Sequence, residues 1–252
     1  ADLQDSLKKI ENFYTDIYKS KTLPITIGGD HLVSLPVLRA LAKDKKVGLF
    51  QFDSHTDTYD TYFGGFKYTH GTPFRRAIEE NLIDPKKYVI LGLRGGLYDP
   101  EDLKWAIEQA VTIITTDKFY EIGIKETIKI VTDILADTPT YFTFDIDGID
   151  PTYAPGTGTP EVGGINVREA QILIRKFNLA IDKYRPRNIA ISGGVSANQE
   201  FRESIKELDN KYDLKVLIPK KEYSTDNAAM IAIAGYYKYQ QGLFTDLSTS
   251  VN

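Results

Sequence analysis

The chain has 252 residues, with 31 Lys and Arg against 35 Asp and Glu and a formal net charge of −4. Both signs of charge are interspersed, which argues against a dedicated nucleic-acid surface, because phosphate binding needs clustered Lys and Arg. The absence of Cys excludes disulfides, thiolate zinc sites, iron–sulfur clusters and cysteine nucleophiles, and it fits a cytoplasmic location. No apolar run approaches the ~18 residues of a membrane span, and the charged N-terminus, which begins at Ala1 rather than Met, is no signal peptide.

Apolar segments and helical patterns alternate along the chain. Residues 1–20 space apolar side chains three to four positions apart, the period of an amphipathic helix. Strands are then expected at 23–27, 47–52, 88–93, 111–115, 140–144, 188–192 and 214–218, and helices at 34–43, 72–81, 100–109, 124–136, 167–183, 199–210 and 227–240. Nearly unbroken apolar strands between helices predict an α/β fold, namely a three-layer α/β/α arrangement with a mostly parallel sheet.

Polar residues follow three of the expected strands at their carboxyl ends, where the ligands of parallel sheets collect. GGDH (28–31) follows the first strand, DSHTD (53–57) the second, and DID (145–147) the strand at 140–144. If residues 53–57 stay extended, a period of two points their histidine and both aspartates to one side. Each motif alone occurs in ordinary turns, but such groups on a buried strand must be satisfied by some partner.

Apart from Asp30, the three strand ends together offer four aspartates and two histidines. Mixed carboxylate and imidazole groups suit divalent ions such as Mn²⁺ or Mg²⁺. Four carboxylates balance two divalent ions, whereas a single ion would leave two excess negative charges in a confined site. We therefore expect two ions, which would bring the formal charge of the chain to about zero. Two bridged metals can activate water to hydrolyse a stable C–N, amide-like or phosphate bond.

These motifs resemble the signature blocks of the ureohydrolase family, which includes arginase, agmatinase and guanidinobutyrase. The third block extends through FDIDGIDPTYAPGTGTPEVGG (144–164), and HGTPFRRA (70–77) and LIDPKKYVILGLRG (82–95) are nearest the agmatinase and guanidinobutyrase branch. The resemblance covers roughly residues 1–175. It implies an α/β/α fold, two Mn²⁺ ions bridged by hydroxide, hydrolysis of a small guanidino substrate with release of urea, and assembly into a homo-oligomer.

The resemblance also implies roles for individual residues. Asp53 and Asp145 would bridge the ions, Asp57 would help orient the hydroxide, and His70 would move protons to the leaving amine. The full set of implied metal ligands is His31, Asp53, His55, Asp57, Asp145 and Asp147. The commonest residues of the family motifs are replaced at two places, by Leu32 and Ser54.

The tail from about residue 178 resembles a different protein, the ATP-using tRNA threonylcarbamoyl transferase subunit of the actin-like ATPase superfamily. RPRNIAISGGVSANQEFRE (185–203) and YSTDNAAMIAIAGYYKYQQGLFTDL (223–247) look like its C-terminal motifs. A Gly-Gly turn between a strand and a helix can hold phosphate, although it can also be a plain tight turn. Under this reading ATP would bind at Gly193, Gly194, Asn198 and Asp226. The His-x-x-x-His pair of the transferase is absent from this chain.

The sequence is therefore interpreted as a natural or engineered chimera, with a ureohydrolase-like metal-binding part (1–175) and an actin-like-ATPase C-terminal-like part (176–252) packed into one sheet as one domain. Ureohydrolases hold the substrate guanidinium with a Glu after the strand at 188–192. Residues 193–198 contain no acid, and the next one is Glu200. We expect an agmatinase-like or guanidinobutyrase-like hydrolase whose turnover is severely reduced or absent. The alternatives are a nucleotide-binding remnant and an inactive scaffold.

Overall fold

The computed structural model describes residues 2–20, 24, 26, 29–62, 64–97, 100–173, 188–190 and 215–217. The chain divides into two units, residues 1–22 with 30–185 and residues 23–29 with 186–252. The strand predicted at 23–27 lies largely outside the described residues, as do the helices predicted at 199–210 and 227–240. The packing of both parts into one sheet stays a prediction.

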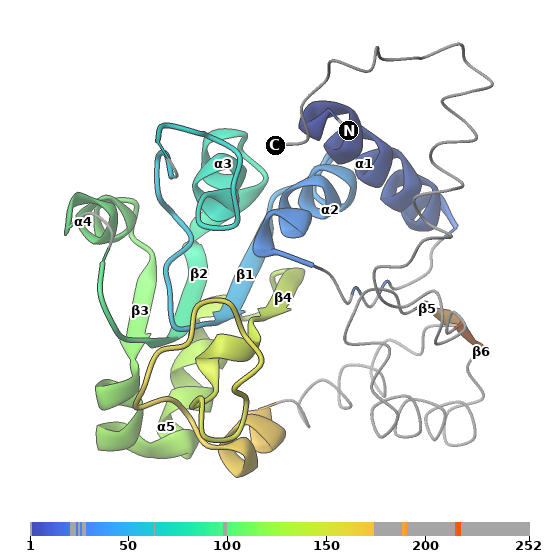
Figure 1. Ribbon diagram of the computed structural model, residues 1–252. Helices are drawn as coiled ribbons and strands as arrows, with labels where there is room; N and C mark the ends of the chain where they lie inside the picture. Colours follow the sequence, from blue (N-terminus) through green and yellow to red (C-terminus); the bar gives the residue numbers. More distant parts are fainter. Residues whose placement is uncertain are drawn as a thin grey trace. The chain divides into compact units, whose positions relative to one another are not determined.

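Four parallel strands form the sheet of the first unit, in the order β3-β2-β1-β4 (Figure 1). Their bounds are β1 (Val47–Phe52), β2 (Ile83–Leu93), β3 (Thr112–Thr115) and β4 (Thr140–Phe144). In the second unit, β5 (Asn188–Ala190) pairs in parallel with β6 (Lys215–Leu217). All six coincide with predicted strands, although β2 begins five residues early. The parallel α/β prediction is confirmed.

Helices of the first unit precede its first strand, connect its successive strands and follow its last strand. They are α1 (Leu3–Lys19), α2 (Ser34–Leu41), α3 (Pro73–Glu79), α4 (Pro100–Glu108) and α5 (Thr116–Leu135), with two short 3-10 helices, η1 (His31–Val33) and η2 (Ile146–Gly148), and a helical segment at 167–173. The helix predicted at 124–136 is the part of α5 that follows a break at Gly123, where φ is 76° and ψ is 165°. Among the described residues, no helix combines the length and apolar character that crossing a bilayer requires.

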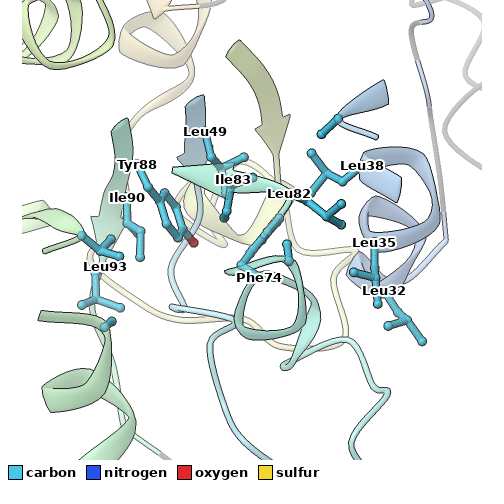
Figure 2. Close-up of a cluster of buried hydrophobic side chains, with 14 of the residues drawn as sticks. Leu32, Leu35, Leu38, Leu49, Phe74, Leu82, Ile83, Tyr88, Ile90 and Leu93 are labelled. Atoms are coloured by element: carbon cyan, nitrogen blue, oxygen red, sulfur yellow. The ribbon is translucent and has the colours of Figure 1, made fainter. Parts of the chain in front are cut away.

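Both faces of the sheet are covered, because successive side chains of a strand point to opposite sides. Leu49 and Ile90 pack on one face with Leu35 of α2 and Phe74 of α3 (Figure 2). Phe52, Val89 and Leu91 pack on the other face against α5. This two-sided burial explains why the strands read as continuous apolar runs.

The apolar cluster that packs against α5 extends to the end of the sheet through two stacked rings. Phe52 ends β1 and Phe144 ends β4, and their ring centroids lie 4.3 Å apart with the planes 3° from parallel. Gly148, in η2, lies directly against the ring of Phe52, where a Cβ atom would sit 2.6 Å from Phe52 Cδ1 and 3.2 Å from Asp53 N. The close approach of η2 to the sheet therefore needs a residue without a side chain.

We predict that Gly148→Ala lowers the free energy of unfolding by about 1–3 kcal/mol, because a buried and fully packed ring must move to admit the methyl group. Urea denaturation of the full chain measures the change. Gly156→Ala is the matched control, since a Cβ there meets nothing within 4 Å. Equal stability of the two variants would contradict the packing argument.

Candidate metal centre

The carboxyl ends of β1 and β4 bring two aspartates to one edge of the sheet. Asp145 N donates to Phe52 O at 2.8 Å, and Asp53 N donates to Leu91 O at 3.0 Å. The inter-strand hydrogen bonding thus continues one residue past each strand. Asp53 and Asp145 consequently lie at the same edge, as expected of residues that follow parallel strands.

Residues 53–57 do not stay extended, so the condition under which a period of two would align their side chains is not met. The chain leaves β1 at Phe52, and Asp57 adopts a positive φ of 50°. Asp53 Oδ1 accepts a hydrogen bond from His55 N at 2.7 Å, which closes a tight turn directly after the strand. Turn geometry, rather than the alternation of a strand, therefore brings the side chains of this motif together.

The first group of candidate ligands surrounds His31, which begins η1. Its Nδ1 lies 2.8 Å from Asp57 Oδ2, 3.1 Å from Asp53 Oδ2 and 3.4 Å from Asp145 Oδ2. On the other side of the ring, Nε2 lies 2.7 Å from Thr143 Oγ1 of β4. A proton on Nε2 would satisfy Thr143 and leave the Nδ1 lone pair directed at the carboxylates.

The second group surrounds His55. Its Nδ1 lies 3.2 Å from Asp147 Oδ2 and 3.6 Å from Asp53 Oδ1. Asp147 accepts hydrogen bonds from the hydroxyls of Ser54, at 2.7 Å, and Thr159, at 2.9 Å. These two donors fix the carboxylate beside the imidazole.

Asp53 belongs to both groups, which are His31, Asp53 and Asp145, and Asp53, His55 and Asp147. The potential ligand atoms within each group lie within 4.8 Å of one another. Asp53 is 1% exposed, and it directs Oδ2 toward His31 and Oδ1 toward His55. The structure thus gathers five of the six sequence-predicted ligand candidates into two groups that share one buried carboxylate, and it places the sixth, Asp57, beside His31.

The electrostatics of the cluster show that it requires positive charge. Burial lowers the pKa of His31 and of His55, but Asp53 and Asp57 raise that of His31 well above its ordinary value, while Asp147 and Asp53 raise that of His55 to about 11. Burial and the charge of Asp53 raise the pKa of Asp57 to about 7 and that of Asp145 to about 6. Without a metal ion, protons must supply this charge.

One buried atom of the cluster is placed as a ligand of a metal ion would be. Within the described part of the chain, His31 Nδ1 is buried and has no hydrogen-bond partner, although three carboxylates lie within 3.4 Å of it. The distances are short, but the directions do not suit an N–H donor. A nitrogen lone pair and carboxylate oxygens directed at one point are the donor set of a divalent cation, so the residues fit such an ion.

The remaining predicted residues lie elsewhere. His70 is half-buried in the loop between Asp60 and Thr72, and its ring makes an edge-to-face contact with Tyr62 at 5.4 Å between centroids. It belongs to neither group of candidate ligands. The predicted nucleotide residues Gly193, Gly194, Asn198 and Asp226 lie outside the described residues.

Sequence reasoning missed Arg94, which holds the loop after η2. Its guanidinium donates to six backbone carbonyls, those of Gly92, Asp147, Gly148, Ile149, Glu161 and Val162, over 2.6–3.3 Å. It thereby fixes the backbone of Asp147. The available signal was a lone cation directly after an apolar strand, in the sequence GLRG (92–95).

Glu161 was also missed. Its Oε1 lies 3.8 Å from His55 Nε2, and its carboxyl group occupies the space that a side chain at Gly95 would need. Gly95 has a φ of +79°, so the loop there requires glycine on both counts. Glu161 therefore adds a carboxylate on the outer side of the His55 ring.

The chain is similar to known proteins over part of its length. Over 174 residues the chain is 49% identical to the guanidinopropionase of Pseudomonas aeruginosa. The matched region covers 69% of this chain and 55% of that protein. The chain is 42% identical to the guanidinobutyrase of the same organism, with 69% and 54% covered. Among solved structures, the proclavaminate amidino hydrolase from Streptomyces clavuligerus matches with a TM-score of 0.65 and 35% identity, over 69% of this chain and 58% of that one.

The chain spans about half the length of the curated relatives it matches. The matched region contains both groups of candidate ligands. Residues 1–183 match the Arginase family, to which the chain therefore belongs.

Proposed function

We propose that this chain is a metal-dependent hydrolase that cleaves the C–N bond of a linear guanidino compound and releases urea. The observation that carries the proposal is the sharing of buried Asp53 between two histidine-containing groups of candidate ligands. Two ions, proposed to be Mn²⁺, would be held by His31, Asp53, His55, Asp57, Asp145 and Asp147. Their four positive charges would balance the four carboxylates.

When bound, two divalent ions supply Lewis acidity that lowers the pKa of water toward neutrality and so provides a nucleophile for a stable C–N bond. The chain contributes the orientation of the reacting groups. Asp57 would orient the nucleophile through its carboxylate, which lies 2.8 Å from His31 Nδ1. His70 would carry a proton from the site to the leaving amine through its imidazole. Glu161 lies beside His55, and Thr159 donates a hydrogen bond to Asp147.

The substrate class follows from the relatives, which are named for guanidinopropionate, guanidinobutyrate and agmatine. We propose a linear guanidino compound of this kind as the substrate. Residues 193–198 contain no acid to hold a guanidinium. We therefore propose that catalysis is slow while metal binding is intact. The chimeric origin and the nucleotide alternative stay predictions, since their residues lie outside the described part of the chain.

Metal content is the direct test of the site. After loading with Mn²⁺ and removal of free ion, plasma mass spectrometry should find about two ions per chain. Mn²⁺ at 100 times its Kd should also stabilise the fold by about 2.7 kcal/mol per site. Asp53→Ala should lose most of both effects, because it removes the carboxylate that the two groups share.

Asp133→Ala is the control for this experiment, since Asp133 is an exposed aspartate of α5. It should bind Mn²⁺ as the unchanged chain does. An unchanged chain that retains no Mn²⁺, or an Asp53→Ala variant that still retains two ions, would refute the proposed site.

Urea release tests the reaction. Agmatine, 4-guanidinobutyrate, 3-guanidinopropionate and arginine should be assayed with the Mn²⁺-loaded chain and with Asp53→Ala. We expect slow release that requires Mn²⁺ and is lost in the variant. Rates typical of enzymes, with kcat of about 10 per second, would show that the missing acid at 193–198 does not limit turnover. No urea from any compound would leave a metal-binding protein without the proposed activity.

A further inference from the structure

We propose that Gln51 and Tyr88 are positioning residues that hold Asp53 in the orientation needed to serve both metal groups. This inference rests on the proposed function, because the two buried residues are proposed to orient Asp53, the ligand that both metal ions would share. Neither residue belongs to the candidate ligand groups. Both lie on the strands beneath them, Gln51 on β1 and Tyr88 on β2.

Gln51 is the polar exception in the apolar strand VGLFQF (47–52) and is 0% exposed. A buried amide without partners is costly, so its hydrogen bonds show what it is for. Its Nε2 donates to Asp53 Oδ2 at 2.7 Å and approaches His55 O at 3.3 Å. Its Oε1 accepts a hydrogen bond from the hydroxyl of Tyr88.

Tyr88 determines which end of the amide faces Asp53. The Tyr88 side chain is fully buried within the apolar cluster on this face of the sheet (Figure 2), where its hydroxyl also lies 3.4 Å from Thr56 O. If the amide were reversed, Gln51 Oε1 would face two acceptors, the Asp53 carboxylate and the His55 carbonyl. The hydroxyl of Tyr88 would then face the N–H groups of Gln51 and could no longer donate its proton to Gln51 Oε1. The observed orientation satisfies every group.

The result is a carboxylate held by one chain donor on each oxygen. Asp53 Oδ2 accepts from Gln51 Nε2, and Oδ1 accepts from His55 N at 2.7 Å. With both bonds in place, Oδ2 faces His31 Nδ1 at 3.1 Å and Oδ1 faces His55 Nδ1 at 3.6 Å. Rotation of the carboxylate would break both hydrogen bonds. Gln51 and Tyr88 therefore prepare Asp53 to be shared before any ion binds.

Gln51→Met tests the inference, because it keeps the length and shape of the side chain while removing the amide. Isothermal titration with Mn²⁺ should show an apparent affinity about 10- to 100-fold weaker than in the unchanged chain, the loss expected for a residue that orients a metal ligand. Electron paramagnetic resonance of the loaded variant should show less of the signal of coupled Mn²⁺ pairs and more of isolated ions. A purely structural role would not move this ratio.

Tyr88→Phe removes only the hydroxyl and keeps the apolar packing. It should weaken Mn²⁺ binding less than Gln51→Met but in the same direction, because the amide loses the donor that fixes its orientation. Tyr141→Phe is the control: Tyr141 of β4 is half-buried, and its hydroxyl donates to Ser34 Oγ at 3.3 Å rather than to Gln51. Melting temperatures in a chelator verify that all three variants are folded.

The outcomes separate this inference from the proposed function. If the unchanged chain binds two Mn²⁺ ions and both Gln51→Met and Tyr88→Phe bind them equally well, the positioning role is refuted while the metal site stands. An effect of Tyr141→Phe as large as that of Tyr88→Phe would also refute it. If the unchanged chain binds no Mn²⁺, the proposed function and the inference fail together.

Discussion

The need to neutralise four carboxylates at one edge of the sheet governs the rest of this structure. Asp53, Asp57, Asp145 and Asp147 converge where β1 and β4 end, and all but Asp145 are almost completely buried. Two imidazoles direct their Nδ1 atoms into this group. Even with both imidazoles protonated, they would balance only two of the four negative charges, so further protons or cations are needed. Hydroxyl and amide donors around the carboxylates fix their positions but are uncharged, and the guanidinium of Arg94 donates to backbone carbonyls rather than to the carboxylates. The arrangement makes sense as a site preorganised for divalent ions.

Much of the fold and of the site was predictable from the sequence, for identifiable physical reasons. Unbroken apolar strands between helices indicate a sheet covered on both faces, and Leu49 and Phe52 do pack on opposite faces. Residues that follow parallel strands meet at one edge, which was enough to bring Asp53 and Asp145 together. Strand alternation predicted that the side chains of Asp53, His55 and Asp57 lie together. They do lie together, but in a turn, because the hydrogen bond from His55 N to the Asp53 carboxylate ends the extended conformation.

The supporting groups could not be predicted, because their roles depend on contacts between segments far apart in sequence. Gln51 reads as an isolated polar residue in a strand until Tyr88, 37 residues later, is seen to hold its amide. Arg94 reads as a surface cation until the carbonyls 53–68 residues further along surround it. Local sequence patterns carry the ligands of such a site, whereas tertiary structure decides which groups orient them.

Arg94 has a consequence for which parts of this loop can vary. It binds the backbone at both ends of one loop, at 147–149 and at 161–162. Between these anchors the chain exposes Tyr153, and a side chain added at Gly156 or Gly158 would meet open space. Insertions or replacements in residues 151–158 would leave the backbone of Asp147 where it is. A single guanidinium thus separates the part of the loop whose backbone it holds in place from the part, residues 151–158, that can vary in length and sequence.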